Sequence, residues 1–302
     1  MQPSRSRRRC VAFPATIACL LALAVPSVAF ADTSLGTAGT VTYMTNTTGS
    51  FQDSFGSVAV ECPQALALTG GGGDAVSNGF GGAILIAFPG DDDDSDLRSD
   101  DRWTVDVINP VMDSFAQAWA FCTPGPSKLR VTTLQVGADR SRAARAQCPA
   151  GARVTGGGAF AFGGDLAAHW INASHPYDDG DAGTRPEDGW RALVYNDNSA
   201  AASMNVYALC RETAVRYLSA TGGLGSSGAS GEQESPPCPN TEHVAGAGAK
   251  LAAPERRSRI GGIVPTDDSV EAGTLPDDYV VASATNSSPQ SAQLTAFAIC
   301  TP

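Results

Sequence analysis

Short runs of alternating apolar and polar residues, separated by segments rich in glycine, proline and aspartate, recur along the whole chain. Residues 103–108 alternate in this way, and residues 83–88 form a continuous apolar run. A period of two is typical of a half-buried strand, and a short apolar run between turn residues indicates a buried one. No segment keeps a period of 3.6 residues between helix caps. The pattern therefore predicts an all-β protein with little helix.

The strand pattern occurs three times. Each copy begins with Cys-Pro, at Cys62, Cys148 and Cys238, which lie 86 and 90 residues apart. Each copy continues with a glycine-rich stretch, a Pro-x-Asp-Asp segment, an aromatic residue and an asparagine, and it ends in an alternating run with a second cysteine. The aromatic residues are Trp103, Trp190 and Tyr279, and the asparagines are Asn109, Asn196 and Asn286. Such periodicity predicts three tandem repeats of about 88 residues.

The boundaries of the repeats follow from these motifs. We expect a signal segment at residues 1–31 and repeats at residues 32–124, 125–212 and 213–302. In the third repeat, residues 222–237 are rich in Gly, Ser and Glu, a composition that predicts a flexible, solvated loop.

Six cysteines remain after the leader, two in each repeat. Six cysteines allow 15 connectivities, but three equivalent units are most simply cross-linked in the same way. The expected pairs are Cys62 with Cys122, Cys148 with Cys210, and Cys238 with Cys300. Zinc binding is disfavoured because the chain lacks Cys-x-x-Cys pairs and suitably spaced histidines. We therefore expect one disulfide in each repeat.

Two architectures are compatible with three such repeats. In a pseudo-threefold β-prism, the units pack around a common axis and the glycines allow close approach of their backbones. In the alternative, three β-sandwiches stand in a row, each with its own core. The segments between repeats carry strand patterns of their own, which favours mutual packing and the prism.

The leader predicts export. Arg5, Arg7, Arg8 and Arg9 precede an apolar stretch, and Ala29-Phe30-Ala31 is a small-x-small cleavage site. The general secretory route and the twin-arginine route both remain open. Because the leader carries four arginines and no acid, its removal changes the net charge from −11 to −15. That charge argues against nucleic acid as a partner, and no later segment is long and apolar enough to be an integral membrane span.

At these motifs the chain resembles a class of secreted bacterial modules with the pattern Cys-Pro-x-Gly-x-x-Val-x-Gly-Gly-Gly and a closing Ala-x-Ala-Ile-Cys. Residues 148–158 match the first part best, and residues 296–300 match the ending. That class has no assigned activity, so the resemblance implies a bacterial secreted protein and no mechanism. More distantly, the repeat is similar to the threefold β-prism of the vitelline membrane outer layer protein family. This second likeness implies prism topology and, more remotely, carbohydrate binding.

The Pro-x-Asp-Asp segments place an acidic loop in every repeat. The loop aspartates are Asp91, Asp92, Asp178, Asp179, Asp267 and Asp268. Clustered carboxylates on a loop can bind extracellular Ca²⁺ weakly, but a solvated turn has the same composition. None of the loops has the twelve-residue calcium pattern with its glycine and terminal glutamate. We therefore expect no cofactor, with weak calcium binding as the open alternative.

Trp103 and Trp190 are candidates for stacking on sugar rings, but their place at the head of an alternating strand favours core packing. We find no catalytic constellation in the sequence: its three histidines occupy unmatched positions, and no serine lies in Gly-x-Ser-x-Gly. The sequence therefore predicts a secreted, non-enzymatic binding module or an envelope-associated structural module. The alternative is a carbohydrate-active protein, either a lectin or a glycoside hydrolase, with a cell-wall or extracellular glycan as the partner.

Overall fold

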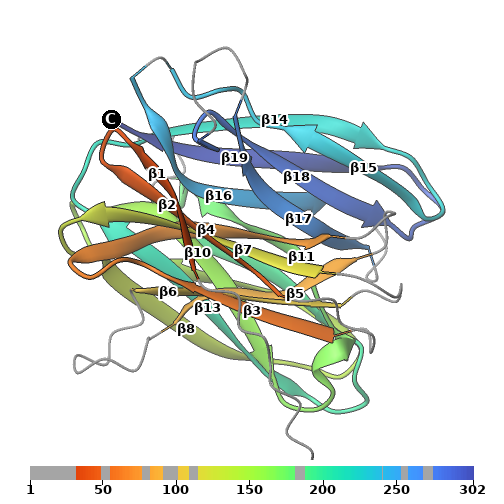
Figure 1. Ribbon diagram of the computed structural model, residues 1–302. Coiled ribbons are helices and arrows are strands. Elements are labelled where there is room, and N and C mark those ends of the chain that lie inside the picture. The colour runs from red at the N-terminus through yellow and green to blue at the C-terminus, as the bar shows by residue number, and fades with distance from the viewer. Residues whose placement is uncertain are drawn as a thin grey trace, which may run out of the picture.

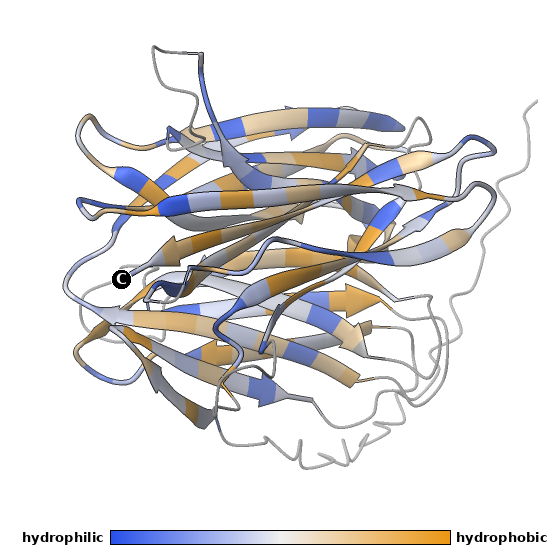
Figure 2. Ribbon diagram, turned by 90° about the horizontal axis from the view of Figure 1, so that it is seen from above, coloured by the Kyte–Doolittle hydropathy of each residue, from blue (hydrophilic) through white to orange (hydrophobic). Residues whose placement is uncertain are grey.

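The computed structural model describes residues 32–48, 55–76, 82–90, 101–108, 115–180, 188–239, 241–252, 258–267 and 275–302. Within these ranges the chain forms nineteen strands and one short 3-10 turn, η1 (Leu166–Ala168). The expected all-β class is confirmed. Orange and blue positions alternate along many strands in Figure 2, as expected for strands with one face in the core. The expected signal segment, residues 1–31, lies outside the described residues.

Each repeat contributes six strands in the same order, and β1 (Thr33–Ala38) precedes the first set. Repeat 1 contains β2 (Val41–Thr47), β3 (Phe55–Glu61), β4 (Leu66–Val76), β5 (Ala83–Gly90), β6 (Arg102–Ile108) and β7 (Phe115–Pro124). Repeat 2 contains β8 (Lys128–Val136), β9 (Arg140–Gln147), β10 (Arg153–Phe162), β11 (His169–Tyr177), β12 (Gly189–Asn196) and β13 (Ala202–Arg211). Repeat 3 contains β14 (Arg216–Leu224), β15 (Ala229–Glu234), β16 (His243–Ala252), β17 (Arg259–Thr266), β18 (Tyr279–Asn286) and β19 (Ala292–Thr301). The expected repeat boundaries fall between β7 and β8 and between β13 and β14.

The strands form three antiparallel sheets, and every sheet contains strands of two repeats (Figure 1). The first sheet has the order β1-β2-β7-β4-β17-β18-β15, the second β3-β6-β5-β10-β13-β8, and the third β14-β19-β16-β11-β12-β9. The repeats join where β4 pairs with β17, β10 with β5, and β16 with β11. Each repeat thus gives half of its strands to one sheet and half to the next. This cyclic exchange is the expected β-prism-like arrangement, and the alternative of three separate sandwiches is wrong.

The glycine-rich stretches lie where the three repeats meet. A Cβ on Gly246 would lie 1.8 Å from the carbonyl oxygen of Thr155, and Cβ atoms on Gly156 and Gly70 would lie 2.4 and 2.9 Å from a carbonyl oxygen of another repeat. Real Cβ atoms do not come so close to backbone oxygen, so only glycine fits. β4, β10 and β16 therefore meet backbone to backbone at a pseudo-threefold axis.

The second glycine of the stretch makes room for a core tryptophan. A Cβ on Gly71 would lie 2.3 Å from the Trp103 ring, and one on Gly157 would lie 2.4 Å from the Trp190 ring. Trp103 and Trp190 pair with Pro89 and Pro176 and are 2% and 1% exposed. Their burial is the core packing that the alternating pattern favours.

The third repeat fills the same space differently. Val280, and not Tyr279, pairs with Pro265, the proline that corresponds to Pro89 and Pro176. Val280 is fully buried, Ala247 stands in place of the second glycine, and Tyr279 is half-exposed. The alignment of Tyr279 with the two tryptophans is therefore wrong by one residue. In the third repeat, an alanine and a valine thus stand where the other two repeats have a glycine and a tryptophan.

The three disulfides join Cys62 to Cys122, Cys148 to Cys210 and Cys238 to Cys300, so the expected pairing is confirmed. Each bridge connects the segment before the third strand of a repeat to its sixth strand. The two strands are already hydrogen-bonded neighbours, as β4 and β7 are in the first sheet. The cross-link therefore fixes the pair next to the axis.

Residues 222–237 are not a flexible loop. The end of β14 pairs with β19, and β15 pairs with β18 at an edge of the first sheet. These are the first and second strands of the third repeat, and their counterparts are β2 and β3 in the first repeat. The prediction failed because backbone pairing to a formed sheet edge does not require apolar side chains.

Buried asparagines hold the turn after the fifth strand in two repeats. Asn196 and Asn286 are fully buried, and each Nδ2 donates to the carbonyl oxygen four residues later, that of Ala200 or Gln290. Asn109 lies outside the described residues. The asparagine of the motif is thus a turn residue in both copies where it is described.

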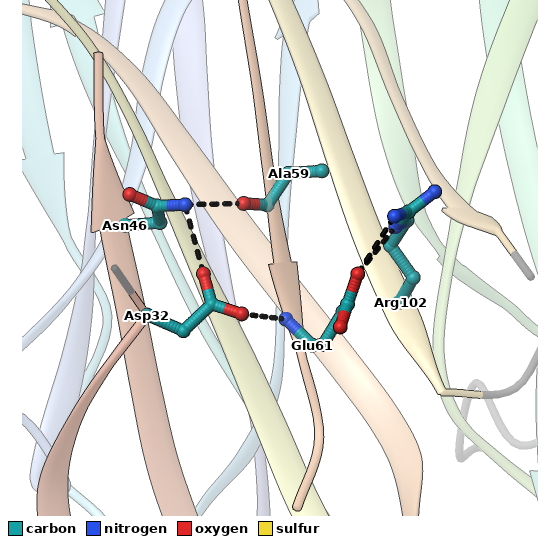
Figure 3. A network of polar contacts seen from close by, with 5 residues as sticks. All are labelled: Asp32, Asn46, Ala59, Glu61 and Arg102. Atoms are coloured by element: carbon teal, nitrogen blue, oxygen red, sulfur yellow. Dashed lines mark hydrogen bonds and ion pairs between the residues drawn. The ribbon is translucent and has the colours of Figure 1, made fainter. Parts of the chain in front are cut away.

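Figure 3 shows how the start of the described chain ties two sheets together. The Asp32 carboxylate accepts hydrogen bonds from Asn46 Nδ2 at 2.8 Å and from the Glu61 backbone N–H at 3.1 Å. Asn46 Nδ2 also donates to the Ala59 carbonyl at 2.8 Å, and Glu61 forms an ion pair of 2.7 Å with Arg102. Asn46 lies on β2 of the first sheet. Ala59 and Glu61 lie on β3 of the second sheet, and Arg102 lies on β6 of the same sheet. The network therefore fixes one corner of the prism.

Candidate functional site

Four aromatic side chains form a continuous row on the second sheet, on the face opposite the core. We call this row the aromatic ladder; it consists of Phe88 on β5, Phe160 and Phe162 on β10, and Tyr207 on β13. On β10 the alternating neighbours Ala159 and Ala161 are buried, whereas Phe160 and Phe162 are partly exposed. The period of two therefore turns both phenyl rings away from the core.

The rings of the ladder stack on one another. The Phe88 ring centroid lies 5.0 Å from that of Phe160 and 5.7 Å from that of Tyr207, and Phe160 lies 5.3 Å from Phe162. The angles between the ring planes are 20°, 28° and 25°, which is a stacked arrangement. β10 lies between β5, which carries Phe88, and β13, which carries Tyr207. The β10 residue that pairs with Tyr207 is Gly158. Because Gly158 has no side chain, the rings of Phe88 and Tyr207 can approach each other across it.

Polar side chains border the ladder on β13 and β8. Asn205 pairs with Phe160 in the sheet, and its Nδ2 donates to the Tyr207 hydroxyl at 3.1 Å. Thr133 on β8 donates to Asn205 Oδ1 at 2.7 Å. Burial raises the pKa of the Tyr207 phenol, so this group stays neutral at physiological pH. A flat apolar strip thus lies beside amide and hydroxyl groups.

The other two sheets do not repeat the ladder. The position of Phe88 is defined by the proline that follows it, and those of Phe160 and Tyr207 by the pairing of the third and sixth strands. In the third sheet they hold His175, Lys250 and Phe297, and in the first sheet they hold Val264, Asp74 and Trp119. The scaffold is threefold, but all three positions carry phenyl or phenol rings in the second sheet alone. The third sheet keeps one stacked pair, His175 on Phe297, and the first keeps Trp119.

Part of the signal for this surface is present in the local sequence. The run Phe160-Ala161-Phe162 places two aromatic residues on one face of a strand. Phe88 belongs to a different repeat, and nothing in the local pattern shows that β5 and β10 are neighbours. The ladder could therefore not be assembled before the pairing of repeats was known.

The predicted binding residues lie elsewhere. Trp103 and Trp190 are core residues, so neither ring is accessible for stacking on a sugar. Trp190 Nε1 donates to Ser174 Oγ at 2.8 Å. The equivalent of Ser174 next to Trp103 is Ala87, and Trp103 Nε1 is buried without a partner in the described part of the chain. The two tryptophans are thus related packing elements that differ in one hydrogen bond.

Asp178 and Asp179 lie close to Asp188, and one ligand oxygen of each lies within 4.8 Å of the others. The Asp179 backbone N–H donates to Asp188 Oδ2 at 2.6 Å, and the Gly180 N–H donates to Asp178 Oδ1 at 2.7 Å. Asp267 is half-buried at the end of β17, apart from this group. Asp91, Asp92 and Asp268 lie outside the described residues. Backbone amides already hold two of the three clustered carboxylates, so weak calcium binding stays a prediction.

The histidines occupy three different environments. His169 and His175, both on β11, are buried, and burial lowers the pKa of each, that of His175 to about 4. His175 stacks on Phe297 with a centroid distance of 5.0 Å. His243 Nδ1 lies 2.6 Å from Asp277 Oδ2. The first two are neutral core groups near pH 7.

A scan against models of known protein families and a search of curated proteins gave no match to this chain. Across the described ranges, no helix has the length and apolar character needed to span a bilayer. The fold and the site therefore define this protein as an all-β, disulfide-linked prism of three repeats with one aromatic face.

Proposed function

We propose that this protein is a secreted, non-enzymatic binding module that holds a cell-wall or extracellular glycan on its aromatic ladder. The observation that carries the proposal is the break in symmetry. Three equivalent faces are available. The second sheet carries the four stacked rings of the ladder, whereas the third carries the single His175–Phe297 stack beside Lys250, and the first carries Trp119 beside Val264 and Asp74. Folding alone requires no such difference, because all three sheets form with their own residues at these positions.

Stacked rings beside amides and hydroxyls suit a saccharide. The face of an aromatic ring carries negative charge density, which attracts the polarised C–H groups on the flat side of a sugar ring. Asn205, Thr133, Gln135 and Ser203 are positioned to exchange hydrogen bonds with sugar hydroxyls at the border of the ladder. Aromatic residues with few rotamers also supply contact area at a low entropic cost.

The net charge and the disulfides are consistent with an extracellular glycan-binding protein. The net charge of −11 disfavours a polyanionic partner. Three disulfides fit an extracellular protein, since such bonds persist outside the reducing cytosol. Secretion itself is part of the proposal and rests on the leader expected at residues 1–31.

The test is a glycan array and a peptidoglycan pull-down with the mature protein, followed by calorimetry on the glycan that binds. The double variant Phe160→Ala/Phe162→Ala removes half of the ladder. We expect its affinity to fall at least about tenfold, because each buried aromatic contact contributes on the order of 1 kcal/mol or more.

Lys250→Ala is the matched control, because Lys250 occupies on the third sheet the position that Phe160 occupies on the second. It should bind as the wild type does. Equal affinity of wild type and double variant would exclude the ladder as the binding surface, and the absence of any glycan ligand would favour a purely structural role in the envelope.

A further inference from the structure

A second feature lies at one end of the pseudo-threefold axis. Here a cavity of about 210 Å³ opens to solvent, and we call it the axial pocket. Its lining includes Thr69, Thr123, Thr155, Arg211, Ala245 and Thr301. These residues come from all three repeats, so the pocket exists only in the assembled prism. By volume it could hold about seven water molecules or one small polar molecule.

The floor of the pocket is built by the residues at which the β-strand register shifts. Thr69, Thr155 and Ala245 are the bulge positions directly before the axial glycines, and all three are almost fully buried. The Thr69 hydroxyl donates to a carbonyl oxygen at 2.9 Å, and the Thr155 hydroxyl does so at 3.2 Å. Each hydroxyl oxygen keeps lone pairs with which it can accept a hydrogen bond.

The pocket wall contains a buried hydroxyl without a partner. Thr123 is 5% exposed, and its Oγ1 makes no hydrogen bond to any residue that the structure describes. Burying a polar group in this way costs free energy unless another molecule satisfies it. Thr123 is thus available to donate a hydrogen bond to a molecule in the pocket.

One position of the wall breaks the symmetry. The residues directly after the closing cysteines are Thr123, Arg211 and Thr301, so a guanidinium replaces one of three hydroxyls. Arg211 is half-buried, and one of its Nη atoms donates to the Pro124 carbonyl. Among the described residues, no carboxylate forms an ion pair with Arg211. A cation held in a pocket of an acidic protein without a counter-charge is a site for an anion.

We propose that the axial pocket binds a small hydroxylated carboxylate, such as a sugar acid, with its carboxylate on Arg211 and Thr123. The hydroxyls of the ligand then donate to the oxygens of Thr69 and Thr155. A planar guanidinium matches a carboxylate better than it matches a neutral sugar, so the charge selects the acid. This site is separate from the aromatic ladder and does not depend on the glycan proposed to bind there.

The probe is D-glucuronate, with D-glucose as the neutral analogue of the same ring, and the measurement is calorimetric titration of the mature protein at pH 7. We expect glucuronate to bind at least about tenfold more tightly than glucose, since hydrogen bonds to charged groups are about twice as strong as neutral ones. Equal binding of the two, or no binding of glucuronate at millimolar concentration, would overturn the proposal.

Two variants test the assigned groups. Arg211→Gln should weaken glucuronate binding at least about tenfold, whereas Arg130→Gln, which removes an exposed arginine from β8, should not change it. Thr123→Val should weaken binding several-fold without lowering the melting temperature, because the hydroxyl has no partner in the free protein. A lower melting temperature with unchanged affinity would instead show a structural role for Thr123.

The ladder variant Phe160→Ala/Phe162→Ala separates this proposal from the previous one. It should bind glucuronate as the wild type does. If the double variant loses glucuronate binding and Arg211→Gln keeps it, the acid binds on the aromatic face and the axial pocket is excluded.

Discussion

The phenol hydroxyl of Tyr43 donates a hydrogen bond of 2.6 Å to the backbone carbonyl of Val244, 201 residues further along the chain. Two other hydroxyls make the equivalent contact: Tyr217 donates to the Val154 carbonyl and Ser127 to the Leu68 carbonyl, each at 2.7 Å. In every case the first part of one repeat donates to the residue before the bulge of another. These hydrogen bonds form a ring that closes the prism, and Tyr43 joins its first and last repeats.

Tyr43→Phe tests this closure. The phenylalanine keeps the packing but leaves the fully buried Val244 carbonyl without its partner, so we expect a loss of about 1 to 3 kcal/mol in the free energy of unfolding. Urea denaturation measures the change. Tyr217→Phe is the comparison, and it should cost less because Tyr217 is only half-buried and water can replace it. If both variants had the same free energy of unfolding as the wild type, the ring of hydrogen bonds would not contribute to stability.

Gly246→Ala tests the backbone contact at the axis. Its new Cβ would lie 1.8 Å from the Thr155 carbonyl oxygen, and neither backbone can move without disturbing a sheet. We expect no folded protein, or a loss of at least about 3 kcal/mol, the upper end for overpacked cores. Gly223→Ala on β14 is the control, since a Cβ there meets nothing within 4 Å. Circular dichroism and thermal melting distinguish the two, and a stable Gly246→Ala would contradict the axial arrangement.

Asp74→Asn should stabilise the protein above pH 6. Burial raises the pKa of this carboxyl to about 6, from a usual value near 3.8, and the nearby Glu232 raises it further. The folded state thus holds the proton more tightly than the unfolded state, so wild-type stability falls as the pH rises from about 4 to about 6. The amide avoids this loss. We expect a gain of about 2 kcal/mol at pH 7.5 and none at pH 3.5. A gain that is independent of pH would disprove the assignment.

His175→Phe should remove a sensitivity to acid. Burial lowers the pKa of His175 to about 4, and Lys250 and Arg191 lower it further. Because its pKa is near 6.5 in the unfolded chain, wild-type stability falls as the pH drops from about 6.5 to about 4.

Phenylalanine fits at this position because Phe88 occupies the equivalent place in the second sheet. At pH 7 the variant should lie within about 1 kcal/mol of the wild type, and at pH 4.5 it should be more stable by about 2 kcal/mol. Chemical denaturation across this pH range is the measurement. Parallel pH profiles for the two proteins would show that another group causes the acid sensitivity.

The amount that could be predicted differs from one feature to the next. Cys148 and Cys210 were paired correctly because the repeat itself restricts the connectivity. Tyr279 was placed one residue out of register, because an aromatic at the same sequence distance is indistinguishable from Trp103 until its strand partner is known. The prediction of a flexible loop at residues 222–237 is wrong because their composition does not show that they pair with strands at the edge of a sheet.

The candidate site shows the same division. The aspartates and tryptophans of the repeat were visible in the sequence, but Trp103 and Trp190 pack in the core. Phe88 and Phe160 meet only because β5 of one repeat pairs with β10 of the next. Arg211 and Thr123 come together only where three chain segments converge at the axis.

The sequence by itself determined the strand class, the three repeats and the disulfides, because period, spacing and cysteine number are properties of the linear chain. The tertiary structure alone decided which repeats share a sheet, which face carries the aromatic rings and where the axial pocket opens. Those features depend on contacts between residues up to 201 positions apart, and such contacts are selected by backbone complementarity and close packing that no local pattern records.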